Sequence, residues 1–228
     1  MKIIDRNTGK RLVEPLKGSK EKITKKVEKV LDKEEYSPMD PPDAYDLNYT
    51  LNDVKVSDMN PLLQTYIKEH DKTLKELELF EQVMIEFKNS NYNLTQHISD
   101  VAGGFFTFFD DKIIDQNRRE EQTIFPILKE KLLASGEHNT DEDNPHTAVD
   151  LMEDEHVSFI QSASLIFNML GLAARIPDPA SRAVICDLAY HTAVEFIEQL
   201  KLHIFKEDHT LFPLAHKLIS KNEFKKLA

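Results

Sequence analysis

The chain has 228 residues, and its 40% apolar content with only six glycines is typical of a helix-rich globular protein. Lysine and arginine number 29 against 40 aspartates and glutamates, so the net charge is −11, which argues against nucleic-acid binding by a clustered basic face. The single cysteine, Cys186, cannot form an internal disulfide and lies in an apolar run, so we expect a buried free thiol. No stretch reads as a signal peptide or as long enough to span a membrane, which predicts a cytoplasmic protein without membrane contact.

Residues 1–58 form a predicted N-terminal extension that differs from the rest of the chain. It contains one short charged helix over about residues 20–35, whose lysines are interleaved with acidic residues as in a solvated helix. Pro38, Pro41 and Pro42 then favour an extended, proline-rich linker. We treat the extension as a candidate contact for a protein partner or a second copy of the chain, and expect a chain that begins near Val56 to fold and bind metal without it.

Residues 59–217 show the periodicity of four long helices. Asn60 is a good N-cap, and Pro61 suits the first helical turn. Beyond it, apolar residues recur at intervals of three and four, and Gly103-Gly104 marks a bend or a close approach of a neighbouring helix. The predicted helices cover about residues 61–89, 94–133, 145–175 and 180–217, with no strand signal between them. This pattern predicts an all-α, up-down-up-down four-helix bundle, followed by a C-terminal tail over 218–228.

The two predicted helical hairpins repeat one pattern of polar residues. Glu120 follows His70 by 50 residues (120 − 70), and Glu207 follows His156 by 51 (207 − 156). Each glutamate precedes a Phe-Pro pair, with the phenylalanine five residues later in both halves. The repeated elements are, in chain order, Glu69-His70, Gln116-x-x-x-Glu120, Glu155-His156 and His203-x-x-x-Glu207. The repeat therefore places the same kinds of side chain at the same depth in both hairpins.

These polar residues lie on faces that are otherwise apolar. His203 and Glu207 project from one face of a helix together with Phe196 and Leu200, which indicates the core side. A single histidine in such a setting is more often a hydrogen-bonded core residue, but burying three imidazoles and two carboxylates in one layer is costly unless a metal binds them. The residues predicted to ligate a non-haem iron centre are His70, Glu120, His156, His203 and Glu207. The remaining histidines at 138, 146, 209 and 216 are expected to stay outside it.

The motifs Glu120-Glu121-x-x-Ile124-Phe125-Pro126 and His203-x-x-x-Glu207-Asp208-x-x-Leu211-Phe212-Pro213 carry a family resemblance. Over about residues 59–217 the chain resembles the haemerythrin-like, or HHE cation-binding, family. The resemblance implies two iron ions bridged by Glu120 and Glu207 with histidines at each end, manganese and zinc being the alternative metals. Family members bind dioxygen, sense oxygen or iron, handle nitric oxide, or help repair iron–sulfur clusters.

Two positions depart from the family pattern. Gln116 stands where a histidine is expected, and Met152 stands where oxygen-carrying members have a further histidine. By resemblance the chain is closer to the sensor and repair branch than to the oxygen carriers. Because an amide oxygen is a weaker donor than imidazole, we expect unequal metal positions, with tighter binding near His156 and His203. We expect an open coordination position near His70 for a diatomic ligand such as dioxygen or nitric oxide, with Gln116 a candidate weak ligand.

The same glutamine supports a second hypothesis of a different class. In this alternative the bundle has a degenerate metal site and serves as a protein-interaction or regulatory module through its N-terminal extension. The sequence contains no signature of a substrate pocket, a nicotinamide site or a flavin site, so enzymatic activity is left open.

Overall fold

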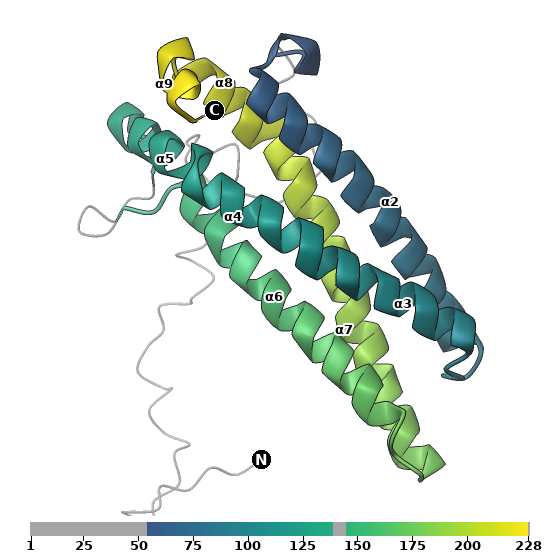
Figure 1. Ribbon diagram of the computed structural model, residues 1–228. Helices are drawn as coiled ribbons and strands as arrows, with labels where there is room; N and C mark the ends of the chain where they lie inside the picture. Colours follow the sequence, from purple (N-terminus) through teal and green to yellow (C-terminus); the bar gives the residue numbers. More distant parts are fainter. Residues whose placement is uncertain (1–53, 139–144, 228) are drawn as a thin grey trace, which may run out of the picture. The chain divides into compact units, whose positions relative to one another are not determined.

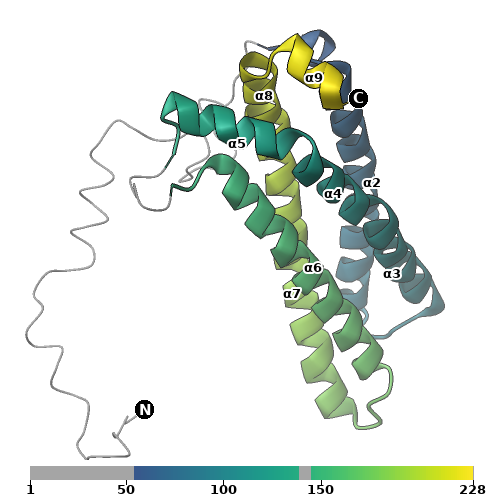
Figure 2. The ribbon, with the colours of Figure 1, turned by 60° about the vertical axis from the view of Figure 1, so that its left-hand side comes forward.

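A computed structural model describes residues 54–138 and 145–227, and this part of the chain is helical without any strand. Its four long helical segments lie side by side (Figures 1 and 2). The helices are η3 Val56–Asp58, α2 Pro61–Asn89, α3 Gln96–Phe108, η4 Phe109–Ile113, α4 Ile114–Gln122, α5 Ile124–Ser135, α6 Ala148–Ala173, α7 Pro179–Lys206, η5 Glu207–Leu211, α8 Phe212–Leu218 and α9 Lys221–Leu227. The predicted charged helix and proline-rich linker lie outside the described residues.

Local side-chain chemistry fixes where the long helices begin. The Asn60 side chain accepts a hydrogen bond from the Leu62 N–H, and α2 starts at the predicted proline, so this prediction is confirmed. Thr147 and Asp150 form a reciprocal capping box at the start of α6. Asp178 caps α7 by accepting from the Ser181 N–H at 2.8 Å. Each boundary follows from a residue that satisfies backbone N–H groups left open by the first helical turn.

The second and fourth segments are not the unbroken helices that the sequence predicted. The second segment contains a π-helical turn, η4, and breaks again at Thr123, while the fourth contains the π-helical turn η5. The breaks at Thr123 and η5 come just before Pro126 and Pro213, which have no N–H to donate to a carbonyl four residues earlier. Gly103 and Gly104 lie inside α3, and a Cβ at either would meet no atom within 4 Å, so they do not permit a close helix approach.

Two hydrophobic clusters fill the bundle. We call them the large cluster, which lies between α2, α3, α6 and α7, and the small cluster, which joins α2, α5, the start of α6, α8 and α9. In the large cluster the rings of Phe80 and Phe105 stack with centroids 4.2 Å apart, and Phe196 meets Phe105 and Phe159 edge on. The small cluster includes Phe224 of α9, so part of the predicted C-terminal tail packs onto the bundle.

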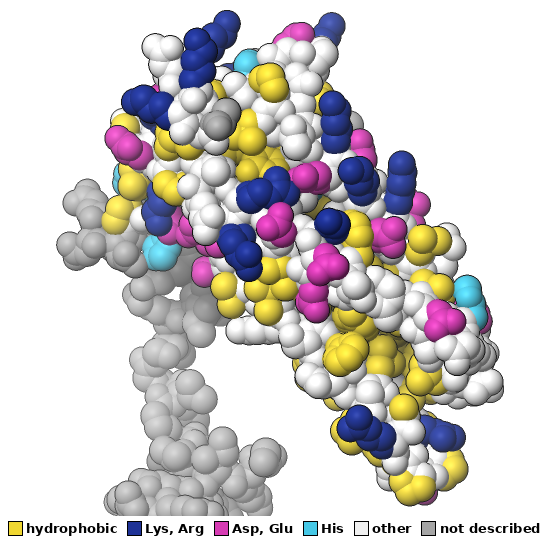
Figure 3. Space-filling model, in the orientation of Figure 1, with side chains coloured by type: hydrophobic (Ala, Val, Ile, Leu, Met, Phe, Trp, Pro, Cys, Tyr) yellow, Lys and Arg dark blue, Asp and Glu magenta, His cyan; other side chains and the backbone are white. Residues whose placement is uncertain are grey.

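The outer face of α6 is unusually apolar. No Asp, Glu, Lys or Arg lies between Glu155 and Arg175, and Val157, Leu165 and Phe167 are all more than half exposed. Figure 3 shows hydrophobic side chains gathered on the lower part of the molecule, where α3, α6 and α7 lie in Figure 1. Among the described residues α6 is long and apolar enough to cross a membrane by length and composition, which corrects the sequence expectation. It is also a bundle helix, since its buried residues belong to both hydrophobic clusters, although only 33% of its most apolar window is buried.

Candidate metal centre

A buried layer of polar side chains separates the two hydrophobic clusters. The sequence predicted all six of its members, and every one is at most 4% exposed. They come from all four helical segments: His70 of α2, Gln116 and Glu120 of α4, His156 of α6, His203 of α7 and Glu207, the first residue of η5. We refer to these six residues as the polar layer. The fold therefore brings together side chains that lie up to 137 residues apart (207 − 70).

Each histidine of the polar layer is held from outside by a carboxylate on a neighbouring helical segment. In each pair the imidazole Nδ1 lies at hydrogen-bond distance from one carboxylate oxygen, so the Nδ1–H donates and the tautomer is fixed. The pairs are His70 with Asp208 at 2.7 Å, His156 with Glu121 at 2.8 Å and His203 with Glu155 at 2.7 Å. Consequently the three Nε2 atoms face the interior of the layer, which is the arrangement of metal-ligating histidines.

The two glutamates of the layer each span the space between the histidines. Glu207 places Oε2 3.2 Å from His70 Nε2 and Oε1 3.4 Å from His203 Nε2. Glu120 places Oε1 3.9 Å from His70 Nε2 and Oε2 3.9 Å from His156 Nε2. Each carboxylate thus directs one oxygen to His70 and the other to the pair formed by His156 and His203.

The donor atoms of the layer fit a pair of cations. Both Glu207 oxygens and Glu120 Oε2 are buried without a hydrogen bond, because the nearby Nε2 contacts lack hydrogen-bond geometry. His156 Nε2 and His203 Nε2 lie 3.1 Å apart, so both lone pairs cannot face each other without a proton or a metal between them. The ligand atoms of His156, His203 and Glu207 lie within 4.8 Å of one another, and so do those of His70, Glu120 and Glu207. Glu207 belongs to both groups.

The ionisable groups of the polar layer shift one another's pKa values. Burial lowers the pKa of His203, but the charge of Glu207 and the hydrogen bond that the imidazole donates to Glu155 raise it to about 9. Burial and the charge of His203 lower the pKa of His156, so of the two facing Nε2 atoms the one on His203 holds a proton more readily. Burial and the charge of Glu207 raise the pKa of Glu120 to about 8. Divalent cations would replace these protons, because metal ligands bind in their deprotonated forms.

A comparison with protein families agrees with this geometry. The family model for the hemerythrin HHE cation binding domain matches residues 61–215, which include the whole polar layer. The chain belongs to this family. No curated protein and no solved structure gives a significant match. Membership in a cation-binding family, together with the two His/Glu groups, makes this a metal-binding HHE domain.

The HHE domain repeats its outer contacts in both halves. Arg119 donates to Glu69 at 2.8 Å between α4 and α2, and Lys206 donates to Glu155 at 2.8 Å between α7 and α6. These cations directly precede Glu120 and Glu207, and the acidic partners directly precede His70 and His156. The outer ion pairs therefore follow the same repeat as the polar layer.

The inner contacts differ at one position. Glu155 accepts from His203 as well as from Lys206, whereas Glu69 pairs with Arg119 and receives no imidazole from residues 54–138 or 145–227. Gln116, which occupies the position equivalent to His203, instead donates its side-chain N–H to Glu120 Oε1 at 3.0 Å. The two halves of the HHE domain are thus symmetric outside the layer and unequal within it.

Sequence reasoning missed the residues that orient the histidines, although the repeat contained them. Glu121, Glu155 and Asp208 each directly neighbour a member of the polar layer in the sequence. An acidic residue beside His70, Glu120, His156 and Glu207 was the available signal, but only the packing shows which histidine each carboxylate reaches. Met152 is fully buried in the small cluster, which places it among apolar side chains.

Proposed function

We propose that this HHE domain binds two iron ions in the polar layer and acts as a redox or sensing module for a diatomic ligand, dioxygen or nitric oxide. The supporting observation is the pair of donor groups that share Glu207, with every Nε2 oriented inward by an outer carboxylate. Glu120 is proposed as a second bridge because its two oxygens face opposite histidines. When bound, iron supplies one-electron chemistry and an affinity for dioxygen.

The two metal positions are proposed to be unequal. His156 and His203 give one position two imidazoles with Glu207, whereas the other has His70 with two carboxylates. Gln116 offers only a neutral amide there, a weaker donor than imidazole. The His70 position is therefore the proposed site of exchange with a small ligand, and reversible oxygen carriage is the less favoured role. Manganese or zinc remain alternatives for the same donors.

Ferrous titration of metal-free protein tests this proposal. Calorimetry under anaerobic conditions should show two unequal binding steps that add up to two ions per chain, checked by elemental analysis. The oxidised protein should absorb in the near ultraviolet, and nitric oxide should change the spectrum of the ferrous form. Protein from iron-supplemented cells that is colourless and metal-free would contradict the proposal.

That contradictory outcome is the one expected for the second candidate function, a bundle with a degenerate metal site that serves as an interaction module. Gln116 is the observation that favours it, because it removes one imidazole from the layer.

We also infer the up-down-up-down order of the four segments, supported by the short connections from α2 to α3 and from α6 to α7. A partner or oligomer contact through the N-terminal extension remains a prediction.

A further inference from the structure

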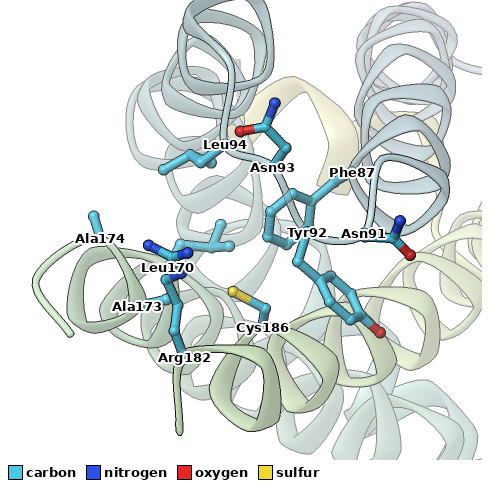
Figure 4. A pocket seen from close by; sticks show the side chains of 10 residues that line it. All are labelled: Phe87, Asn91, Tyr92, Asn93, Leu94, Leu170, Ala173, Ala174, Arg182 and Cys186. Carbon is cyan, nitrogen blue, oxygen red and sulfur yellow. The ribbon is translucent and has the colours of Figure 1, made fainter. Parts of the chain in front are cut away.

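A cavity lies far from the polar layer. It measures about 350 Å³ and is formed where α2 and α6 end and α7 begins (Figure 4). Phe87 lies 17 residues beyond His70 in α2, and Cys186 lies 17 residues before His203 in α7. At 1.5 Å per helical residue, the cavity is about 25 Å from the polar layer along these helices. It is therefore a separate site from the metal centre.

The floor of this cavity is apolar. Phe87, Leu170, Ala173 and Cys186 line it and are buried. Its volume is at the lower end of the range for small-molecule sites. Asn91, Asn93 and Arg182 also line the cavity, and its surface as a whole is more polar than apolar. The floor therefore suits a short hydrocarbon or a small ring.

The rim of the cavity carries one arginine. Arg182 is exposed, its side chain borders the cavity beside Leu170 in Figure 4, and it makes no ion pair with any residue of the described ranges. The nearby Asp187 is already engaged, since it accepts hydrogen bonds from Lys88 and Tyr92. Asp178, which caps α7, accepts from the Ser181 N–H. Arg182 is thus a cation available to a ligand at the mouth of a cavity with an apolar floor.

The loop that forms the opposite wall is held in an unusual conformation. Asn91 and Tyr92 both have left-handed backbones, with φ of 54° and 61°. Asparagine tolerates this region, but a tyrosine there is strained and needs its surroundings to hold it. The Tyr92 hydroxyl interacts with Lys88 and with Asp187 of α7, which ties the loop across the end of the bundle. Such strain is concentrated at ligand sites and switch regions.

We propose that this cavity binds a small organic carboxylate with an apolar tail, its carboxylate on Arg182 and its tail against Phe87 and Cys186. A guanidinium matches a carboxylate with two parallel N–H donors, which no other charged side chain provides in this geometry. The apolar floor binds the tail by removing it from water. A neutral ligand with the same tail gains only the second of these contributions.

Isothermal titration of the full-length protein with octanoate and with 1-octanol tests the proposal. Octanoate should bind about tenfold more tightly than 1-octanol, the effect of one charge-assisted hydrogen-bonding contact. Arg182→Gln should abolish this preference. Arg175→Gln is the matched control, because Arg175 is an exposed arginine at the same end of the bundle that does not line the cavity, and it should leave the preference unchanged. A far-ultraviolet circular dichroism spectrum of Arg182→Gln that matches the wild type verifies its fold.

Cys186 offers an independent measurement, because it is the chain's single thiol and lies in the cavity floor. Octanoate should slow its modification by a thiol reagent in the wild-type protein and in Arg175→Gln, but not in Arg182→Gln. The proposal is overturned if octanoate fails to bind the wild type, if 1-octanol binds equally well, or if Arg182→Gln binds octanoate as tightly as the wild type.

Discussion

The two halves of the repeat share their outer framework and differ in their inner donors. In one half, Glu155 receives both Lys206 and the imidazole of His203. In the other, the equivalent Glu69 receives Arg119 and, within the described part of the chain, no imidazole. The ion pairs between helices persist although one inner imidazole is missing. Gln116 therefore makes the metal-binding donors of the two halves unequal, while the ion pairs that join the helices around them stay equivalent.

Removing the residue that both donor groups share should have the largest effect. In Glu207→Ala both donor groups lose their common carboxylate, so we expect metal content to fall from two ions to near zero. The fold should survive, because the lost carboxylate is itself buried without a hydrogen bond. Elemental analysis and circular dichroism check this, with the exposed Glu198→Ala on α7 as the control. Unchanged metal content would exclude Glu207 as the shared ligand.

Equivalent substitutions of the outer carboxylates separate the two halves. Glu155→Gln should weaken the tighter metal position about 10- to 100-fold, because Glu155 orients His203. Glu69→Gln should change either position by less than about threefold, since Glu69 orients no imidazole. Ferrous titrations of both variants measure the contrast, and Asp154→Asn, an exposed neighbour, serves as the control. Equal losses in the two variants would show that the outer carboxylates do not act through histidine orientation.

Restoring the missing imidazole should reduce the difference between the halves. In Gln116→His, a second imidazole joins His70 at the weaker position, with Glu69 placed to accept its N–H as Glu155 does for His203. We expect the weaker ferrous step to tighten about tenfold and to approach the stronger one. Adding Glu69→Gln to this variant should remove most of the gain. Two equal steps already present in the wild type would mean that Gln116 does not create the inequality.

Removal of residues 1–53 should have the smallest effect, since no member of the polar layer lies among them. Val54 packs against the small cluster, so a chain that begins there keeps the contacts of the described bundle. Both ferrous affinities should stay within about twofold of the full chain. Precipitation or loss of metal from the shortened protein would show instead that the extension completes the core.

The sequence determined the α2 helix, its N-cap at Asn60 and the membership of the polar layer. These features depend on local propensities and on a repeat of histidines and glutamates, both of which can be read directly from the amino-acid sequence. The same signals failed at the π-helical turns, because buried positions continue at intervals of three and four through η4 and η5 while the backbone changes its hydrogen bonding.

Only the tertiary structure decided which carboxylate holds which histidine. Asp208 follows Glu207 in the sequence, yet it binds His70, 138 residues away and on another helix. Likewise, the cavity at Arg182 exists only because the ends of α2 and α6 meet the start of α7. Helical patterning fixes the face on which a side chain lies, but the partner across a helix interface depends on the rotation and axial position of both helices. Those are set by packing of the whole core, and no short stretch of sequence contains them.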